Sequence, residues 1–122
     1  MSILTQFLIA LVAVLHIGFL LLEMLLWDKP RGMKTFNLTP AFAKQSKTLA
    51  ANQGLYNGFL AAGLIWSLWP IGAPDTGRAI ATFFLGCVIV AGIFGAATVS
   101  RRILYVQAVP AMLALAALWL IG

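Results

Sequence analysis

The chain has 122 residues, of which 62% are hydrophobic and only 9% are charged. Soluble domains carry about 25% charged residues, so this composition excludes a water-soluble globule. The high apolar content also excludes a disordered chain, and a single cysteine, Cys87, excludes a disulfide scaffold. We expect one compact all-α membrane domain over residues 1–122, built as a bundle of four transmembrane helices.

Four apolar segments are long enough to cross a bilayer, which takes about 20 residues. In chain order they cover residues 3–27, 49–69, 79–99 and 104–121. Turn and charge signals separate these segments: Pro30 and Gly32, then Pro70, Gly72, Pro74 and Gly77, then Arg101 and Arg102. Because the last break is so short, the third and fourth helices are expected to form an antiparallel hairpin.

The first segment has a second interpretation, a cleaved signal peptide with a small-residue zone at residues 11–14. Two observations favour a membrane span instead. No Lys or Arg precedes the apolar run, and the run continues through Leu26, beyond the core of a signal peptide.

Basic residues gather in two of the three connections, and only Arg78 lies in the remaining one. The others are Lys29, Arg31, Lys34, Lys44, Lys47, Arg101 and Arg102. Since Lys and Arg mark the cytoplasmic side, both termini are expected outside, with a long cytoplasmic loop between helices one and two. The net charge of +5 is then a topological signal. The expected partner is membrane lipid, and nucleic acid is not expected.

The long first connection is polar, but it carries a helix start signal. Thr39 followed by Pro40 is typical of an N-cap with proline at the first helical position, so helix two is expected to begin near Pro40. Its first turns would lie at the membrane surface, with Phe42 toward lipid and Lys44 toward headgroups. Two interpretations remain open, a lid over a cytoplasmic opening and an anchor to anionic lipid.

Two ionisable residues, His16 and Glu23, lie inside the first apolar segment. They are seven residues apart, close to two helical turns, and therefore project from one face. Ionisable side chains inside a span normally point into the bundle toward a partner. The candidate partners form a polar stripe on the second segment: Asn52, Gln53, Tyr56 and Asn57.

Polar residues also gather in the cytoplasmic half of the other helices, whereas the outer half is nearly all apolar. Tyr105 and Gln107 begin the fourth segment, and Trp27 ends the first. The asymmetry predicts a polar pocket that opens inward, with Trp27, Tyr105 and Gln107 as its secondary lining.

Small residues predict where helices approach closely. Gly54 and Gly58 form a small-xxx-small pair on a side of the second helix largely opposite Asn52 and Tyr56, and helix packing is their expected role. Pro110 lies inside the fourth segment, where it removes a backbone hydrogen bond and should kink the helix.

The possible ligands do not predict a metal site. Two helical turns place His16 and Glu23 about 10 Å apart, too far to share one ion. Cys87 is interpreted as a small buried hydrophobe. The sequence has no phosphate-binding glycine loop and no haem attachment motif, so no cofactor is expected.

Three functions remain open. In the first, the pocket binds or transports a small molecule, with Glu23 as the acidic binding group and His16 as its proton partner. In the second, the same pair acts as general acid and base in a membrane enzyme of the isomerase type on a lipid-like substrate. In the third, Glu23 only locks the helices together. A homo-oligomer stays open for each function.

The string Asn52-Gln53-Gly54-Leu55-Tyr56-Asn57-Gly58, with His16, Glu23 and Trp27, resembles a bacterial family of small integral membrane proteins. That family is catalogued as a domain of unknown function, number thirteen hundred and four. The resemblance covers essentially the whole chain. It implies a four-helix protein of this length in the bacterial cytoplasmic (inner) membrane, and it implies no catalytic residues.

Overall fold

The computed structural model describes residues 1–69, 72 and 75–122, and these form helices and turns without any strand. The elements are α1 (Ile3–Met24), α2 (Pro30–Phe36), α3 (Pro40–Leu68), α4 (Thr76–Thr98), the π-helix η1 (Leu104–Ala108) and α5 (Val109–Leu120). The all-helical prediction is therefore confirmed for this part of the chain. Pro70 and Pro74, expected to separate two spans, lie outside the described residues.

The helices divide into two compact units, each described by itself below. Unit 1 comprises residues 1–15 and 60–122, and unit 2 comprises residues 16–59. The helices α1 and α3 each contribute residues to both units. A single domain over the whole chain stays a prediction.

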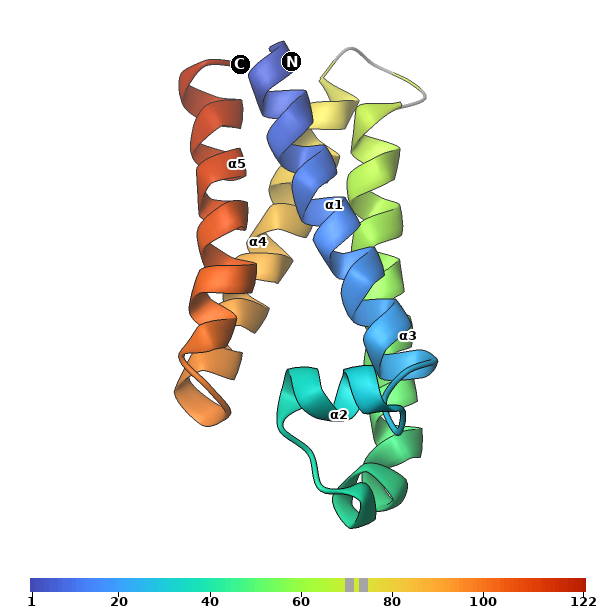
Figure 1. Ribbon diagram of the computed structural model, residues 1–122. Helices are drawn as coiled ribbons and strands as arrows, with labels where there is room; N and C mark the ends of the chain where they lie inside the picture. Colours follow the sequence, from blue (N-terminus) through green and yellow to red (C-terminus); the bar gives the residue numbers. More distant parts are fainter. Residues whose placement is uncertain (70–71, 73–74) are drawn as a thin grey trace. The chain divides into compact units, whose positions relative to one another are not determined.

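Unit 1 is built around an apolar core to which α1, α3, α4 and α5 contribute. Figure 1 shows α4 and α5 running side by side, with the chain ends close together. The buried core residues are Ile9, Val12, Ala13, Leu64, Ala81, Leu85, Val88, Ala111, Ala114 and Leu118. Alanine lines much of the inner face of α5, which lets neighbouring backbones approach closely.

Polar contacts tie together one end of unit 1. The Arg78 guanidinium donates to the Leu118 carbonyl at 2.9 Å and lies over the Trp119 ring, 4.9 Å from its centroid. The indole of Trp119 in turn donates to the Thr82 hydroxyl at 3.0 Å. The two chain termini also meet, because the backbone N–H of Ser2 donates to the Gly122 carbonyl. A cation is favourable at this place because the last carbonyls of α5 lack helical partners.

The fourth predicted helix, residues 104–121, is not one regular helix. Residues Leu104–Ala108 form a π-helical turn, and Pro110 follows at the start of α5. Proline has no N–H, and its ring clashes with the carbonyl four residues earlier in a regular helix. The wider π-turn accommodates this proline, with the Val109 N–H donating to Leu104 five residues back. Gly92 of α4 packs at this turn, because a Cβ there would lie 2.8 Å from the Ala108 nitrogen.

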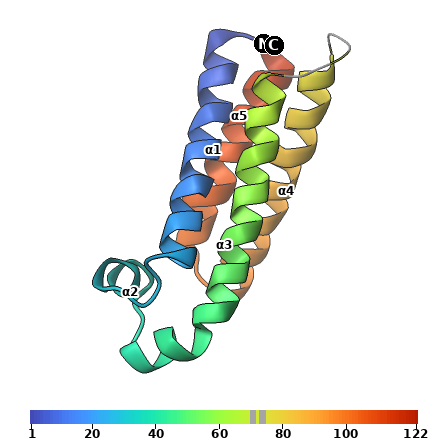
Figure 2. The same ribbon diagram turned by 90° about the vertical axis from the view of Figure 1, so that its right-hand side faces the viewer.

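Unit 2 contains the first connection, which holds a helix that the sequence analysis did not predict. The helix α1 ends at Met24, three residues before the expected end. Pro30, interpreted only as a break, begins the seven-residue helix α2, where its missing N–H costs nothing. Figure 2 shows α2 as a separate turn of chain between the end of α1 and the start of α3.

Local hydrogen bonds explain where α2 ends and where α3 begins. Asn37 ends α2 with a left-handed φ of 54°, and the next N–H, of Leu38, donates to Met33 at 2.8 Å. The helix α3 begins at Pro40, and the Thr39 hydroxyl accepts from the Phe42 N–H at 3.2 Å. The predicted cap at Thr39 and helix start at Pro40 are confirmed.

Two of the described helices, α1 and α4, are long and apolar enough to cross a membrane, judged by length and composition alone. Only 28% of the most apolar window of each is buried, and the remaining residues are partly buried or exposed. A shorter apolar segment covers Leu104–Leu120. The four-span topology and the side on which the termini lie stay predictions.

Candidate functional site

The candidate site lies in unit 2, where a buried carboxyl group joins α1 to α3. Glu23 is 3% exposed, and its Oε1 accepts a hydrogen bond from the Asn57 side-chain amide at 2.5 Å. Asn57 is itself buried. The predicted encounter between Glu23 and the amides of the second long helix is therefore found for Asn57. We call this pair the carboxyl–amide clasp.

Glycine allows the two helices to approach closely enough for the clasp. A Cβ at Gly54 would lie 2.7 Å from Met24 Cγ and 3.0 Å from Glu23 Cβ. A Cβ at Gly58 would lie 2.6 Å from Leu20 Cδ1. The packing role predicted for Gly54 and Gly58 is confirmed.

The polar stripe of α3 meets α1 at one edge only. Around a helix, Asn57 lies about 60° from Gly54 and Gln53 about 100°, whereas Asn52 and Tyr56 each lie about 160° away. Accordingly, Gln53 is exposed but lies within interaction range of the Glu23 carboxyl. Asn52 is exposed on the far side, and Tyr56 is 55% exposed there. A wall formed by all four side chains stays a prediction.

His16 is fully buried in α1 and makes an edge contact with the Phe19 ring, with centroids 5.2 Å apart. It lies two helical turns from Glu23, about 10 Å along the axis. Among residues 1–69, 72 and 75–122, no three His, Cys, Asp or Glu side chains are close enough to hold one metal ion. Cys87 has a free thiol and is partly buried.

The secondary residues fall into different units. Trp27 belongs to unit 2, whereas Tyr105 and Gln107 belong to unit 1. Tyr105 is 67% exposed, and Gln107 is partly buried in η1. Their grouping as a secondary pocket lining therefore stays a prediction.

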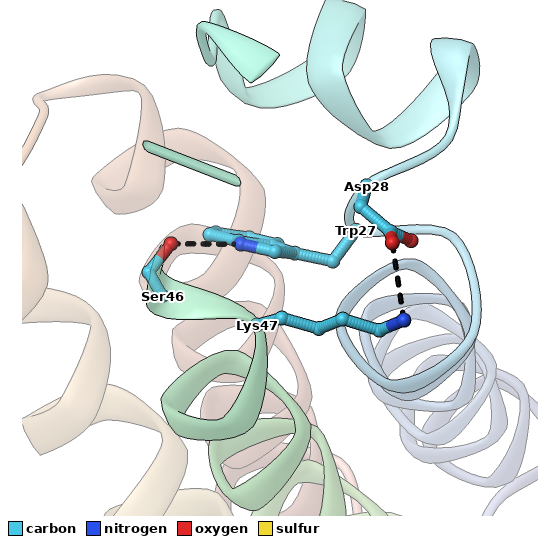
Figure 3. A network of polar contacts seen from close by, with 4 residues as sticks. All are labelled: Trp27, Asp28, Ser46 and Lys47. Carbon is cyan, nitrogen blue, oxygen red and sulfur yellow. Dashed lines mark hydrogen bonds and ion pairs between the residues drawn. The ribbon is translucent and has the colours of Figure 1, made fainter. Parts of the chain in front are cut away.

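The structure adds a contact that the sequence analysis missed, between the α1–α2 turn and the first turns of α3. The Trp27 indole donates to the Ser46 hydroxyl at 3.0 Å, and the Lys47 ammonium lies 3.0 Å from the Asp28 carboxylate. Figure 3 shows the two contacts side by side. The neighbours Trp27 and Asp28 contact the neighbours Ser46 and Lys47, respectively. We call these four residues the interlock. The only sequence signal for it is a Trp-Asp pair directly after an apolar run.

The ion pair between Asp28 and Lys47 in the interlock makes part of the protein's stability depend on pH. The hydrogen bond from Lys47 lowers the pKa of Asp28 below its ordinary 3.8. A carboxyl group with a lowered pKa in the folded state contributes stability above its ordinary pKa, and this contribution is lost as the pH falls through the lower value.

We therefore expect Asp28→Asn to lower the melting temperature slightly at neutral pH and to have no effect well below pH 3.8. Thermal melts of both proteins in detergent, followed by circular dichroism over this pH range, measure the difference. A deficit of equal size at all pH values would contradict an ionic role for Asp28.

Comparison with known proteins gives membership without a mechanism. The family described as "Protein of unknown function (DUF1304)" matches residues 10–119. A similar chain, "Uncharacterized protein YpaA" of Lactococcus lactis, is 31% identical over 117 residues, which cover 94% of this chain and 96% of that protein. No solved structure matches this chain. With nearly its whole length matched, from the middle of α1 to the end of α5, the chain belongs to the DUF1304 family.

Proposed function

We propose that the chain is a multi-pass protein of the bacterial cytoplasmic membrane, with four spans and both termini outside. The length and apolar composition of α1 and α4 support two of the spans. Residues 49–68 of α3 and the segment Leu104–Leu120 would supply the others, since about 17–25 residues suffice for a span.

The placement of basic residues supports the orientation. Arg78 is the basic residue assigned to the outer side, and its charge is held by the Leu118 carbonyl and the Trp119 ring. Arg101 and Arg102, assigned to the cytoplasmic side, are exposed. Exposed Lys and Arg residues favour the cytoplasmic side of a membrane.

Within this topology, we propose that the protein binds a small molecule with a positive charge at Glu23, in exchange for a proton. The observation that carries the proposal is the carboxyl group of Glu23, which is 3% exposed near the end of an apolar helix. An ionisable side chain at such a depth is costly, and it commonly marks a path for ions, protons or substrates. His16, buried on the same helix face, is a second group able to exchange protons.

The test uses the lipophilic cation tetraphenylphosphonium as probe, with the full chain in detergent. We expect binding at about pH 8 that weakens at about pH 5, because protons compete for the carboxylate. Glu23→Gln should weaken binding at least about tenfold and remove its pH dependence. Asp75→Asn, which removes an exposed carboxylate elsewhere, is the matched control. Equal binding by wild type and Glu23→Gln would contradict the proposal.

A second candidate is a purely structural role, favoured by the close contact of Gly54 with Glu23 Cβ. In this case the carboxyl–amide clasp only fixes α1 against α3. Glu23→Ala would then lower the melting temperature, while wild type would show no cation binding at any pH. Glu23→Gln separates the two roles, because the amide keeps the size and the hydrogen-bonding capacity of the clasp but not the charge.

A further inference from the structure

The helix α2 of unit 2 borders an open hollow of about 540 Å³. Its lining residues are Pro30, Arg31, Lys34 and Thr35. Arg31 and Lys34 are three positions apart, so both cations extend from one side of the helix. The hollow is therefore lined by two positive charges and by no acidic residue.

Within unit 2, neither cation forms an ion pair with an acidic side chain. The ion pair in the described part of the chain joins Lys47 to Asp28. Glu23, the other acidic residue of unit 2, is buried against Asn57. Arg31 and Lys34 are both exposed, and their charge is available to a ligand.

The backbone that carries the two cations is held in one place. Gly32 packs on the preceding turn so closely that a Cβ would lie 1.9 Å from the Leu26 carbonyl oxygen. The Phe36 ring packs at a tilt against Trp27, with ring centroids 4.9 Å apart, and Trp27 belongs to the interlock. A charge pair presented on a fixed backbone loses little conformational freedom when it binds an anion.

The distance from α1 along the chain suggests the source of the anion. Only five residues separate Met24 from Pro30. The Leu26 N–H donates to the Leu21 carbonyl of α1, and the Lys29 N–H donates to the Leu26 carbonyl, so these residues form a compact turn. If α1 spans the membrane, as proposed above, the hollow lies in the headgroup layer next to the hydrocarbon core, and this step rests on that proposal. Trp27 beside it is a residue type enriched at this depth.

We propose that this hollow binds a phosphate group, with the Arg31 guanidinium donating to two phosphate oxygens and the Lys34 ammonium contributing a point charge. Arginine suits this contact because its planar donors match two oxygens of a phosphate, while lysine adds charge without fixed geometry. The phosphate belongs either to the headgroup of an anionic lipid or to a small soluble phosphate ester.

The test measures lipid binding to the full chain in detergent by native mass spectrometry, with phosphatidylglycerol and phosphatidylcholine as probes. We expect wild type to prefer phosphatidylglycerol by about tenfold. Arg31→Gln with Lys34→Gln should abolish the preference. The matched control is Arg101→Gln with Arg102→Gln, which removes two positive charges from exposed positions outside the hollow and should keep the preference.

Glycerol 3-phosphate distinguishes the two sources. Displacement of phosphatidylglycerol at millimolar concentration would assign the hollow to a soluble phosphate ester, and lack of displacement would assign it to lipid. Equal losses in both double variants, or no loss in the hollow variant, would overturn the proposal. Extraction of cell membranes with alkaline carbonate tests the membrane placement separately, because a phosphate hollow in a non-membrane protein would still bind the soluble ester.

Discussion

Replacing Gly32 by alanine is expected to displace α2 and to destabilise unit 2 by about 3 kcal/mol. The new Cβ would lie 1.9 Å from the Leu26 oxygen, 2.6 Å from the Leu26 carbonyl carbon and 2.9 Å from the Trp27 Cα. All three are backbone atoms, so no side-chain rotation relieves the clash. The helix must move as a whole, and its contacts with Trp27 are lost.

Limited trypsin digestion measures this effect directly, because Arg31 and Lys34 lie within α2. Cleavage there should become much faster in Gly32→Ala. The matched control is Gly18→Ala in α1, where a Cβ meets nothing within 4 Å. Alanine is the better helix former by about 1 kcal/mol, so this variant should be as stable as wild type or more so. Equal protection of α2 in both variants would show that Gly32 does not hold it.

The second large effect is expected from Asn57→Ala, which removes the amide that Glu23 binds. The loss of a hydrogen bond between membrane helices costs about 1–2 kcal/mol, and here it also leaves a buried carboxyl without this donor. The stability of unit 2 should fall by that amount in a detergent unfolding titration.

Asn52→Ala is the matched control, since the same residue type lies five positions earlier on α3 and is exposed. Its effect should stay within about 0.5 kcal/mol. Combining Asn57→Ala with Glu23→Ala should cost less than the sum of the single changes, because both remove the same contact. Additive losses would mean that the two side chains stabilise the protein independently.

The sequence allowed several elements to be predicted because their causes are local. Thr39 and Pro40 fix the start of α3 through one capping hydroxyl and one missing N–H. The apolar runs of α1 and α4 are long enough to be recognised without any knowledge of their neighbours. The buried partner of Glu23 was expected on the second long helix, where Asn57 indeed provides it.

Other elements could not be predicted because they depend on packing contacts that only the structure shows. With seven residues, α2 is too short to show a helical period, and Gly32 is needed there for its contact with the Leu26 backbone. The π-turn before Pro110 packs against Gly92 of α4, a contact between segments that the sequence does not show. In contrast, the sequence could have predicted which residue of the polar stripe faces α1. Gly54 marks the packed side of α3, and Asn57 is the stripe residue nearest to it around the helix.

The interlock also has a consequence for biosynthesis. Trp27 and Ser46 are 19 residues apart, and Glu23 and Asn57 are 34 apart. All these partners are therefore synthesised before any residue of α4 or α5. Contacts between residues close in sequence form quickly, because little chain entropy is lost in closing them. The contacts within unit 2 can thus form during translation, before the later helices are present as alternative packing partners.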